Sequence, residues 1–125
     1  MIELKEIIQK VGAESAAIMA PHLNEPYLFC KESINMPPEW VEIKNPIDNL
    51  TNNGRVYLSG QSYIAEHIDI EFVGHSISSI LIVPIKKGKK PIATLELIIS
   101  DTGKSLNKDA QKVAEDFAST LATEL

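Results

Sequence analysis

Residues 80–83 read Ile-Leu-Ile-Val and are apolar at every position. The side chains of a β-strand point alternately to its two faces, so a strand with this sequence is buried on both. The run is far shorter than the roughly 20 apolar residues that cross a bilayer as a helix. The sequence therefore predicts a central strand that needs one layer of structure above it and another below it.

A second strand is predicted over residues 92–99, after a short link that contains Gly88. Two strands joined by so short a link form a hairpin. On one face of the second strand the side chains are all apolar: Ala93, Leu95, Leu97 and Ile99. The opposite face carries Ile92, Thr94, Glu96 and Ile98. We expect the apolar face to pack on helices and the other face to lie under the middle of the chain.

Apolar side chains at helical spacing predict a helix at each end of the chain. Gly12 follows the first of these helices and suits a left-handed C-terminal cap, and Asn107 can cap the start of the last one. The apolar stripe of the first helix consists of Leu4, Ile7, Ile8 and Val11. That of the last helix consists of Ala110, Val113, Ala114, Phe117, Ala118, Leu121, Ala122 and Leu125.

The rest of the chain carries weaker signals. Residues 16–20 and 27–30 are short apolar runs joined by turn-forming residues, so we predict two adjacent antiparallel strands. Pro37 and Pro38 suit the start of a helix that ends before Pro46. The remaining predictions are a helical turn over residues 53–58, a strand over residues 62–68 and a loop over residues 69–77.

Together these elements predict one α+β domain over residues 1–125, an α/β sandwich in three layers. The length is typical of one compact domain, and 44% apolar residues are enough for a core. We expect a central antiparallel β-sheet with the N- and C-terminal helices on one face. Residues 37–77 must then form the layer on the other face.

The charge balance and the cysteine count limit the classes of partner and compartment. The formal net charge of -5 disfavours nucleic acid, and the basic residues 86–90 carry no interleaved aromatic ring for base stacking. One cysteine permits no intrachain disulfide and fits a reducing compartment. Glu3 and Glu6 stand where a secretory signal has basic side chains. We therefore predict a cytoplasmic protein that binds neither nucleic acid nor membranes.

Several segments resemble, in the same order along the chain, the elements of GAF domains. Residues 79–85 and 92–97 resemble the paired central strands of that family, in which a serine opens the first strand and a Val-Pro pair closes it. Residues 54–56 and 59–62 resemble the helix and glycine turn before the family's third strand, and residues 106–125 resemble its closing helix. The resemblance implies the GAF fold and a ligand pocket beside the middle segment.

Three activities known in the resembled family lack their residues in this sequence. The spaced Asn/Lys/Phe/Asp/Glu signature of cyclic-nucleotide-binding members does not align with the chain. Members that reduce free methionine sulfoxide use several cysteines, whereas Cys30 is the single one here. Bilin-carrying members attach the pigment through a cysteine beside the pocket, whereas Cys30 is predicted in the second strand. The sequence identifies no cofactor.

Thr94 and Glu96 are polar residues on the pocket-side face of a central strand. A carboxylate in such a strand is unfavourable by several kcal/mol unless it is paired, hydrated or neutral. Glu96 therefore either meets a donor of a ligand or a pocket water, or pairs with the backbone or a neighbouring side chain. Both residues are candidate ligand-binding residues.

His67 and His75 are also candidates, because their segment borders the expected pocket. Together with Asp69 and Glu71 they supply side chains that bind divalent ions. Their spacing matches no defined metal motif, so we predict no metal site. A histidine in a polar loop is ordinarily a solvated side chain.

Trp40, Tyr63 and Phe72 are the aromatic candidates of the middle segment. Planar ligands often stack on such rings. The alternative is a core role, because aromatic residues are only 6% of the chain and a small domain needs them for packing.

These features predict a non-catalytic sensory or regulatory domain that binds a small molecule and signals through its terminal helices. No nucleophile and base stand in a recognised motif, so we predict no catalytic residue. The alternative is a homodimerisation or scaffold module without a ligand, since the two terminal stripes can form a helical bundle across a two-fold axis. A thiol-dependent enzyme that uses Cys30 is the third hypothesis. A homodimer through the terminal helices is the expected assembly.

Overall fold

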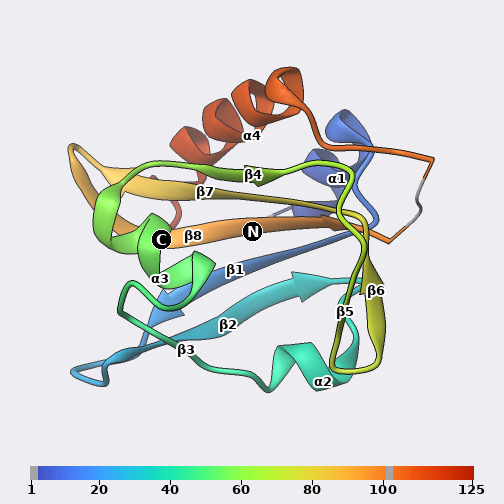
Figure 1. Cartoon of the computed structure of the whole chain (residues 1–125). Helices are drawn as coiled ribbons and strands as arrows, with labels where there is room; N and C mark the ends of the chain where they lie inside the picture. Colours follow the sequence, from blue (N-terminus) through green and yellow to red (C-terminus); the bar gives the residue numbers. More distant parts are fainter. Residues whose placement is uncertain (1–2, 101–102) are drawn as a thin grey trace.

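One antiparallel sheet of six strands runs through the middle of the molecule (Figure 1). The computed structural model describes residues 3–100 and 103–125. In spatial order the strands are β3 (Asn45–Pro46), β2 (Tyr27–Ile34), β1 (Ser15–Pro21), β8 (Lys90–Ile99), β7 (Ser79–Lys87) and β4 (Tyr63–Ala65). A separate two-stranded sheet pairs β5 (Ile70–Phe72) with β6 (His75–Ile77). The helices are α1 (Leu4–Val11), α2 (Pro38–Val41), α3 (Asn52–Ser59) and α4 (Lys108–Leu121).

Strand β7 confirms the prediction made from its apolar run. It lies between β8 and β4, and residues 80–83 are all buried, with Ile80 the most exposed of them at 8%. Leu81 and Val83 pack in the cluster formed with the terminal helices. Ile80 and Ile82 pack in a second cluster on the other face. The strand therefore has a layer of structure on each side, as the alternation of its side chains requires.

Helices α1 and α4 together cover one face of the sheet. Figure 1 shows both of them on one side, away from α2, α3 and the β5–β6 hairpin. The apolar face of β8 packs there as predicted: Ala93, Leu95, Leu97 and Ile99 are all buried in this cluster. The helical stripes that meet them consist of Leu4, Ile7 and Ile8 from α1, and of Ala110, Ala114, Phe117, Ala118 and Leu121 from α4.

The caps of both terminal helices lie where the sequence places them. Gly12 adopts φ 75°, and its N–H bonds the carbonyl of Ile8. Asn107 Oδ1 accepts a hydrogen bond from the N–H of Ala110 over 3.0 Å. Helix α4 is shorter than its predicted stripe, because it ends at Leu121. Val113, predicted within the stripe, is 36% exposed.

The middle of the chain forms the second layer. Helix α2 has only the four residues Pro38–Val41, so it ends well before Pro46. Helix α3 agrees with the predicted helical turn and ends at Ser59, followed by the cap residue Gly60, which adopts φ 72°. Strand β4 covers only three residues of the predicted strand over residues 62–68.

The loop predicted over residues 69–77 is wrong, because this segment is the β5–β6 hairpin. Its two central turn residues, Val73 and Gly74, adopt φ 47° and 80°. Positive φ at both positions is the type I′ geometry, which matches the twist of paired strands. Glycine suits this turn, but a β-branched valine at positive φ is unusual. The turn therefore carries no sequence signal beyond a single glycine.

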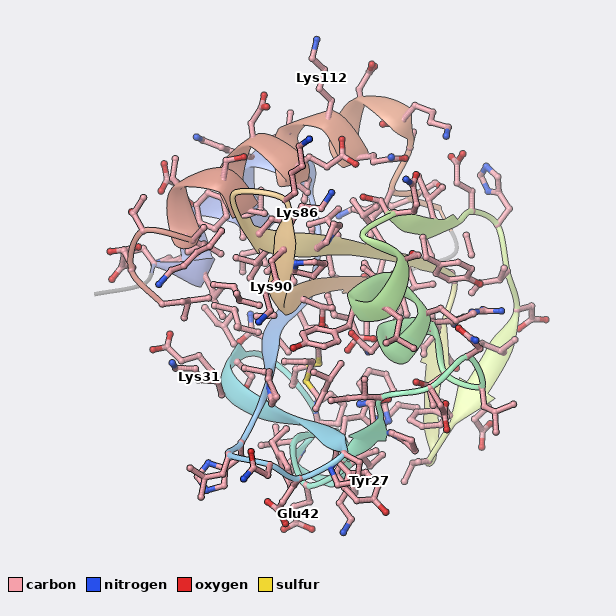
Figure 2. The ribbon with its side chains drawn as sticks, turned by 90° about the vertical axis from the view of Figure 1, so that its left-hand side faces the viewer. Tyr27, Lys31, Glu42, Lys86, Lys90 and Lys112 are labelled. Atoms are coloured by element: carbon pink, nitrogen blue, oxygen red, sulfur yellow. The ribbon has the colours of Figure 1, made fainter. Side chains whose placement is uncertain are left out.

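The lysine-rich turn joins β7 to β8 at the surface. Gly88 adopts φ 63°, and Lys86, Lys87, Lys89 and Lys90 are exposed. Figure 2 shows Lys86 and Lys90 on this hairpin and Lys112 pointing away from α4. Within the described parts of the chain, no helix has the length and apolar character needed to span a membrane.

Candidate functional site

A cavity of about 300 Å³ lies between the sheet and the middle segment. Most of its wall is apolar, and its amide, hydroxyl and carboxyl groups come from β3, Thr51, α3 and β8. The lining residues are Ala17, Met19, Cys30, Met36, Trp40, Val41, Ile43, Asn45, Leu50, Thr51, Asn52, Asn53, Ile70, Phe72, Ile77, Ile80, Glu96 and Ile98. The cavity is thus on the face opposite the terminal helices, where the sequence predicts a pocket.

Glu96 is the charged residue of this wall. It lies on β8, paired with Ala17 of β1 and with Ile82 of β7, so it stands in the middle of the sheet. Its Oε2 accepts a hydrogen bond from Asn53 Nδ2 over 3.2 Å. Within the described residues, Oε1 accepts no hydrogen bond. One oxygen is therefore paired inside the protein, and the other remains available to the cavity.

Burial raises the pKa of Glu96 to about 7, and the hydrogen bond from Asn53 acts in the opposite direction. The side chain lies deep in the molecule but stays partly accessible, because the cavity reaches it. Desolvation disfavours the charged carboxylate, and a donor favours it. Both protonation states of Glu96 are consequently populated near neutral pH.

Asn53 connects α3 to the central strand. Its side chain is 4% exposed, and its Oδ1 accepts a hydrogen bond from Thr94 Oγ1 over 2.8 Å. Thr51 fixes the start of this helix, because its Oγ1 accepts from the N–H of Gly54 over 3.0 Å. Asn53 was not among the residues predicted from the sequence. Its signal was a polar residue in the first turn of a helix predicted to pack on the sheet.

Trp40 and Phe72 form an aromatic wall where α2 meets β5. Trp40 Nε1 donates to the carbonyl of Phe72 over 2.9 Å, and the ring centroids are 6.0 Å apart. His75 packs edge-on against Trp40 at 5.5 Å, and its Nε2 lies 3.0 Å from Glu39 Oε1. This histidine lowers the pKa of the Glu39 carboxyl. Four contacts, between three pairs of residues, therefore hold the β5–β6 hairpin against α2.

The structure brings three of the seven candidate residues to the cavity wall: Trp40, Phe72 and Glu96. His75 lies behind this wall, in contact with Trp40. Thr94 is fully buried beneath Asn53 and does not line the cavity. Tyr63 packs in the apolar cluster around Ile82, beneath Arg55. His67 lies in an exposed turn at φ 52°, away from the cavity lining.

Cys30 lies on β2, in the second strand as predicted, but it lines the cavity, whereas the sequence placed it away from the pocket of the resembled family. It pairs with Met19, which also faces the cavity. Burial raises the pKa of the Cys30 thiol, a hydrogen bond with Ser33 acts in the opposite direction, and the nearby Glu96 carboxylate adds to the effect of burial. A raised pKa keeps the thiol protonated and poorly nucleophilic.

The side chains His67, Asp69, Glu71 and His75 do not converge. Among residues 3–100 and 103–125, no three His, Cys, Asp or Glu side chains are grouped so that they could hold a metal ion. His75 instead contacts Glu39 and Trp40.

Comparisons with known proteins agree with this architecture. A family model described as "GAF domain" matches residues 2–125. The second GAF domain of DevS from Mycobacterium smegmatis is 14% identical with a TM-score of 0.78, covering 96% of this chain and 85% of that chain. The GAF domain of an Acinetobacter phosphoenolpyruvate-protein phosphotransferase is 14% identical with a TM-score of 0.76, covering 96% of this chain and 75% of that one.

A type II free methionine-R-sulfoxide reductase from Thermoplasma acidophilum is also similar, at 17% identity and a TM-score of 0.72. That match covers 95% of this chain and 83% of the reductase. At these identities the likeness concerns the fold. A search of curated proteins finds no match.

Proposed function

The chain belongs to the GAF domain family, and we propose that it senses a small molecule bound in the cavity between the sheet and residues 37–77. GAF domains form a family of regulatory and sensory small-molecule-binding domains that are generally non-catalytic. The proposal specifies where the ligand binds and through which contacts its binding affects the terminal helices.

The observation that carries this proposal is the composition of the cavity wall. Ligand pockets are concave and mostly apolar, with a few polar groups that orient the ligand, and the volume of about 300 Å³ is at the lower end of their range. Here Glu96 has a free oxygen at the wall, and Asn53 holds the other oxygen in place. A fixed, half-satisfied carboxylate inside an apolar cavity supports binding of a ligand that carries a donor.

Ser79 supports the proposed route to α4. Its Oγ donates to the carbonyl of Ala65 at the end of β4 over 3.0 Å. The same oxygen accepts from the N–H of Leu106, just before α4, over 2.9 Å. Strand β8 offers a second route, because Glu96 faces the cavity while Leu95 and Leu97 pack in the cluster with α1 and α4. A ligand that shifts β8 or β4 therefore changes the contacts that hold α4 in place.

A thermal-shift screen with a broad metabolite panel tests the proposal, because a ligand that binds the folded state raises the melting temperature by mass action. Ala17→Leu places a larger side chain in the cavity wall and should abolish the shift produced by any hit. Leu58→Ala is the matched control, since Leu58 lies outside the cavity and is 52% exposed. A panel without any shift, or a hit that survives Ala17→Leu, contradicts the proposed site.

The homodimer through the terminal helices stays a prediction. The apolar stripes of α1 and α4 pack against the sheet and each other, and the side chains left outside include Lys5, Lys112 and Glu115. Sedimentation at high concentration tests it, and a pure monomer contradicts it.

The thiol-dependent enzyme has weaker support, since Cys30 is the single cysteine and its thiol is held protonated. Turnover that is lost in Cys30→Ser would restore that hypothesis.

A further inference from the structure

We propose that the ligand of this cavity is a small organic monocation, an ammonium or amidinium group on an apolar body of one or two rings, whose N–H donates to the free oxygen of Glu96. This inference rests on the proposed function and names the chemical class of its ligand. It follows from the charges, the open hydrogen-bonding position and the ring lining of one cavity.

The charge inside the cavity is negative. Glu96 is the only charged side chain among its described lining residues, and none of those residues is Lys, Arg or His. An anionic ligand would bring a second negative charge into a weakly polar space without a counter-charge. The whole chain adds to this repulsion with a formal net charge of -5. A cationic ligand, in contrast, is attracted both by Glu96 and by the negative net charge of the chain.

The N-terminus of α3 also borders the cavity, and its partial positive charge favours negative groups. Glu96 is the negative group already there, since its Oε2 bonds the side chain of Asn53 in the first turn of that helix. The N–H of Gly54 is taken by Thr51 Oγ1. The first turn of α3 is therefore already bonded to a carboxylate of the protein itself.

The groups around the Glu96 carboxylate are neutral. From β1 and β7, the residues paired with Glu96 are Ala17 and Ile82, which carry no charge. From α3 it meets the neutral amide of Asn53, and from β2 the thiol of Cys30. Around Glu96 the described residues thus include no cation to neutralise it. A ligand cation would complete a charge-assisted hydrogen bond at Oε1, which is stronger than a neutral one.

The rest of the cavity has the volume and the lining for an apolar body. A cavity of about 150 Å³ lined by apolar side chains accommodates benzene, so about 300 Å³ suits an apolar body of one or two rings. Trp40 and Phe72 add aromatic rings to the wall. Aromatic faces attract cations and also stack on planar ligands. The wall therefore complements both parts of an aromatic or cyclic amine.

The affinity for a cation should depend on pH in one direction. Burial raises the pKa of Glu96 to about 7, so part of the free protein carries a protonated carboxyl at neutral pH. A bound cation stabilises the ionised carboxylate and lowers this pKa. The affinity for a cation should therefore increase as the pH rises from about 6 to about 8, with proton release on binding at the lower pH.

Three pairs of probes provide the test. The two members of each pair share the same ring body and carry opposite charges. The pairs are benzamidine with benzoate, phenethylamine with 3-phenylpropionate, and tryptamine with indole-3-propionate, measured in phosphate buffer by ligand-observed NMR and calorimetry. For at least one pair, the cation should bind about tenfold or more tightly than its anion at about pH 8. Calorimetry in two buffers of different ionisation enthalpy should report the released proton at about pH 6.

Glu96→Gln should reduce the cation-over-anion preference to about twofold or less, because the amide keeps the shape of the side chain without its charge. Glu42→Gln is the matched control: Glu42 is an exposed glutamate outside the cavity lining, and its loss changes the net charge equally. The control should keep the preference. If Glu96→Gln does not fold, the pH dependence and proton release of the wild-type chain decide the question.

Binding of the anion of each pair as tightly as the cation overturns the inference, and so does a cation preference that Glu96→Gln retains. If no cation binds while other compounds of the metabolite panel still shift the melting temperature, the cation inference fails and the proposed function stands. If neither the six probes nor the panel bind, both fail. The two proposals are therefore separable by one pair of experiments.

Discussion

Asn53 Nδ2 donates a hydrogen bond to Glu96 Oε2 over 3.2 Å, while Asn53 Oδ1 accepts one from Thr94 Oγ1 over 2.8 Å. The Asn53 amide is thus hydrogen-bonded to two side chains of strand β8 and connects α3 to the centre of the sheet. Buried polar groups are stable only when their partners are present. This small network explains how a glutamate is retained inside an apolar layer and why its second oxygen keeps a fixed position.

Glu96→Gln should stabilise the protein more at high pH than at low pH. Because the pKa of Glu96 is raised from 4.5 to about 7 on folding, its stabilising contribution is complete below the unfolded value and is lost as the pH rises through about 7. At 1.36 kcal/mol per pKa unit, this amounts to roughly 3 kcal/mol at most. Melting temperatures at about pH 5 and about pH 8 check this, and an equal effect at both would contradict it.

Asn53→Ala should reduce the free energy of unfolding by about 1–3 kcal/mol, since it leaves the buried Thr94 hydroxyl without its acceptor. It should also raise the pKa of Glu96 above its present value of about 7, because a donor to the carboxylate is lost. Urea titrations and the pH midpoint of stability measure the two effects. Asn52→Ala is the control, as Asn52 makes its side-chain contact with Arg55 instead.

Gly54→Ala should destabilise the protein by about 1–3 kcal/mol, as overpacked sites do. An added Cβ would lie 2.5 Å from the carbonyl oxygen of Pro46 and 2.7 Å from Thr51 Oγ1, and closer still to the carbonyl of Asp48. The backbone oxygens cannot turn away as a flexible side chain can. Leu58→Ala on the exposed side of α3 should change stability by less than about 0.5 kcal/mol. Equal melting temperatures for both variants would show that α3 can shift freely.

Trp40→Phe should loosen the β5–β6 hairpin without affecting the central strands. The substitution keeps an aromatic ring but removes the donor to the carbonyl of Phe72. Losing one such hydrogen bond should speed amide exchange in β5 and β6 by up to about tenfold. Exchange in β7 and β8 is the internal reference and should not change. Uniform acceleration would mean that the whole domain, rather than the hairpin, had been destabilised.

Cys30 should react slowly with iodoacetamide in the folded protein. Burial raises the pKa of its thiol, so little thiolate is present at about pH 8, and the cavity wall restricts access. Unfolding in urea should accelerate alkylation by at least about tenfold, as followed by mass spectrometry. Equal rates in both states would indicate an activated thiol and favour the enzymatic hypothesis.

The parts of the fold that follow a regular period were predictable from the sequence. The alternation in residues 92–99 assigns Leu95 to one face and Glu96 to the other, and the structure confirms both. The stripes of α1 and α4 repeat at helical spacing and are buried as expected. Such a pattern is a strong signal because several residues at the same period support one assignment of the buried and the opposite face.

The missed features depend on contacts between distant segments or on short elements. Asn53 and Glu96 are 43 positions apart, so their hydrogen bond depends on how α3 docks. Strands β5 and β6 have three residues each, too few for a period to show. Cys30 faces the cavity beside a register shift at Ile18/Met19, and such a bulge interrupts the alternation along a strand.

The large sheet ends in two very short strands, with two residues in β3 and three in β4. Unpaired strand edges can recruit further chains and start aggregation, and short edge strands are one way in which proteins limit this. The apolar stretch around Leu81 is flanked by β8 on one side and β4 on the other. Its backbone can template intermolecular pairing only after β4 detaches, so conditions that release β4 set the threshold for self-association.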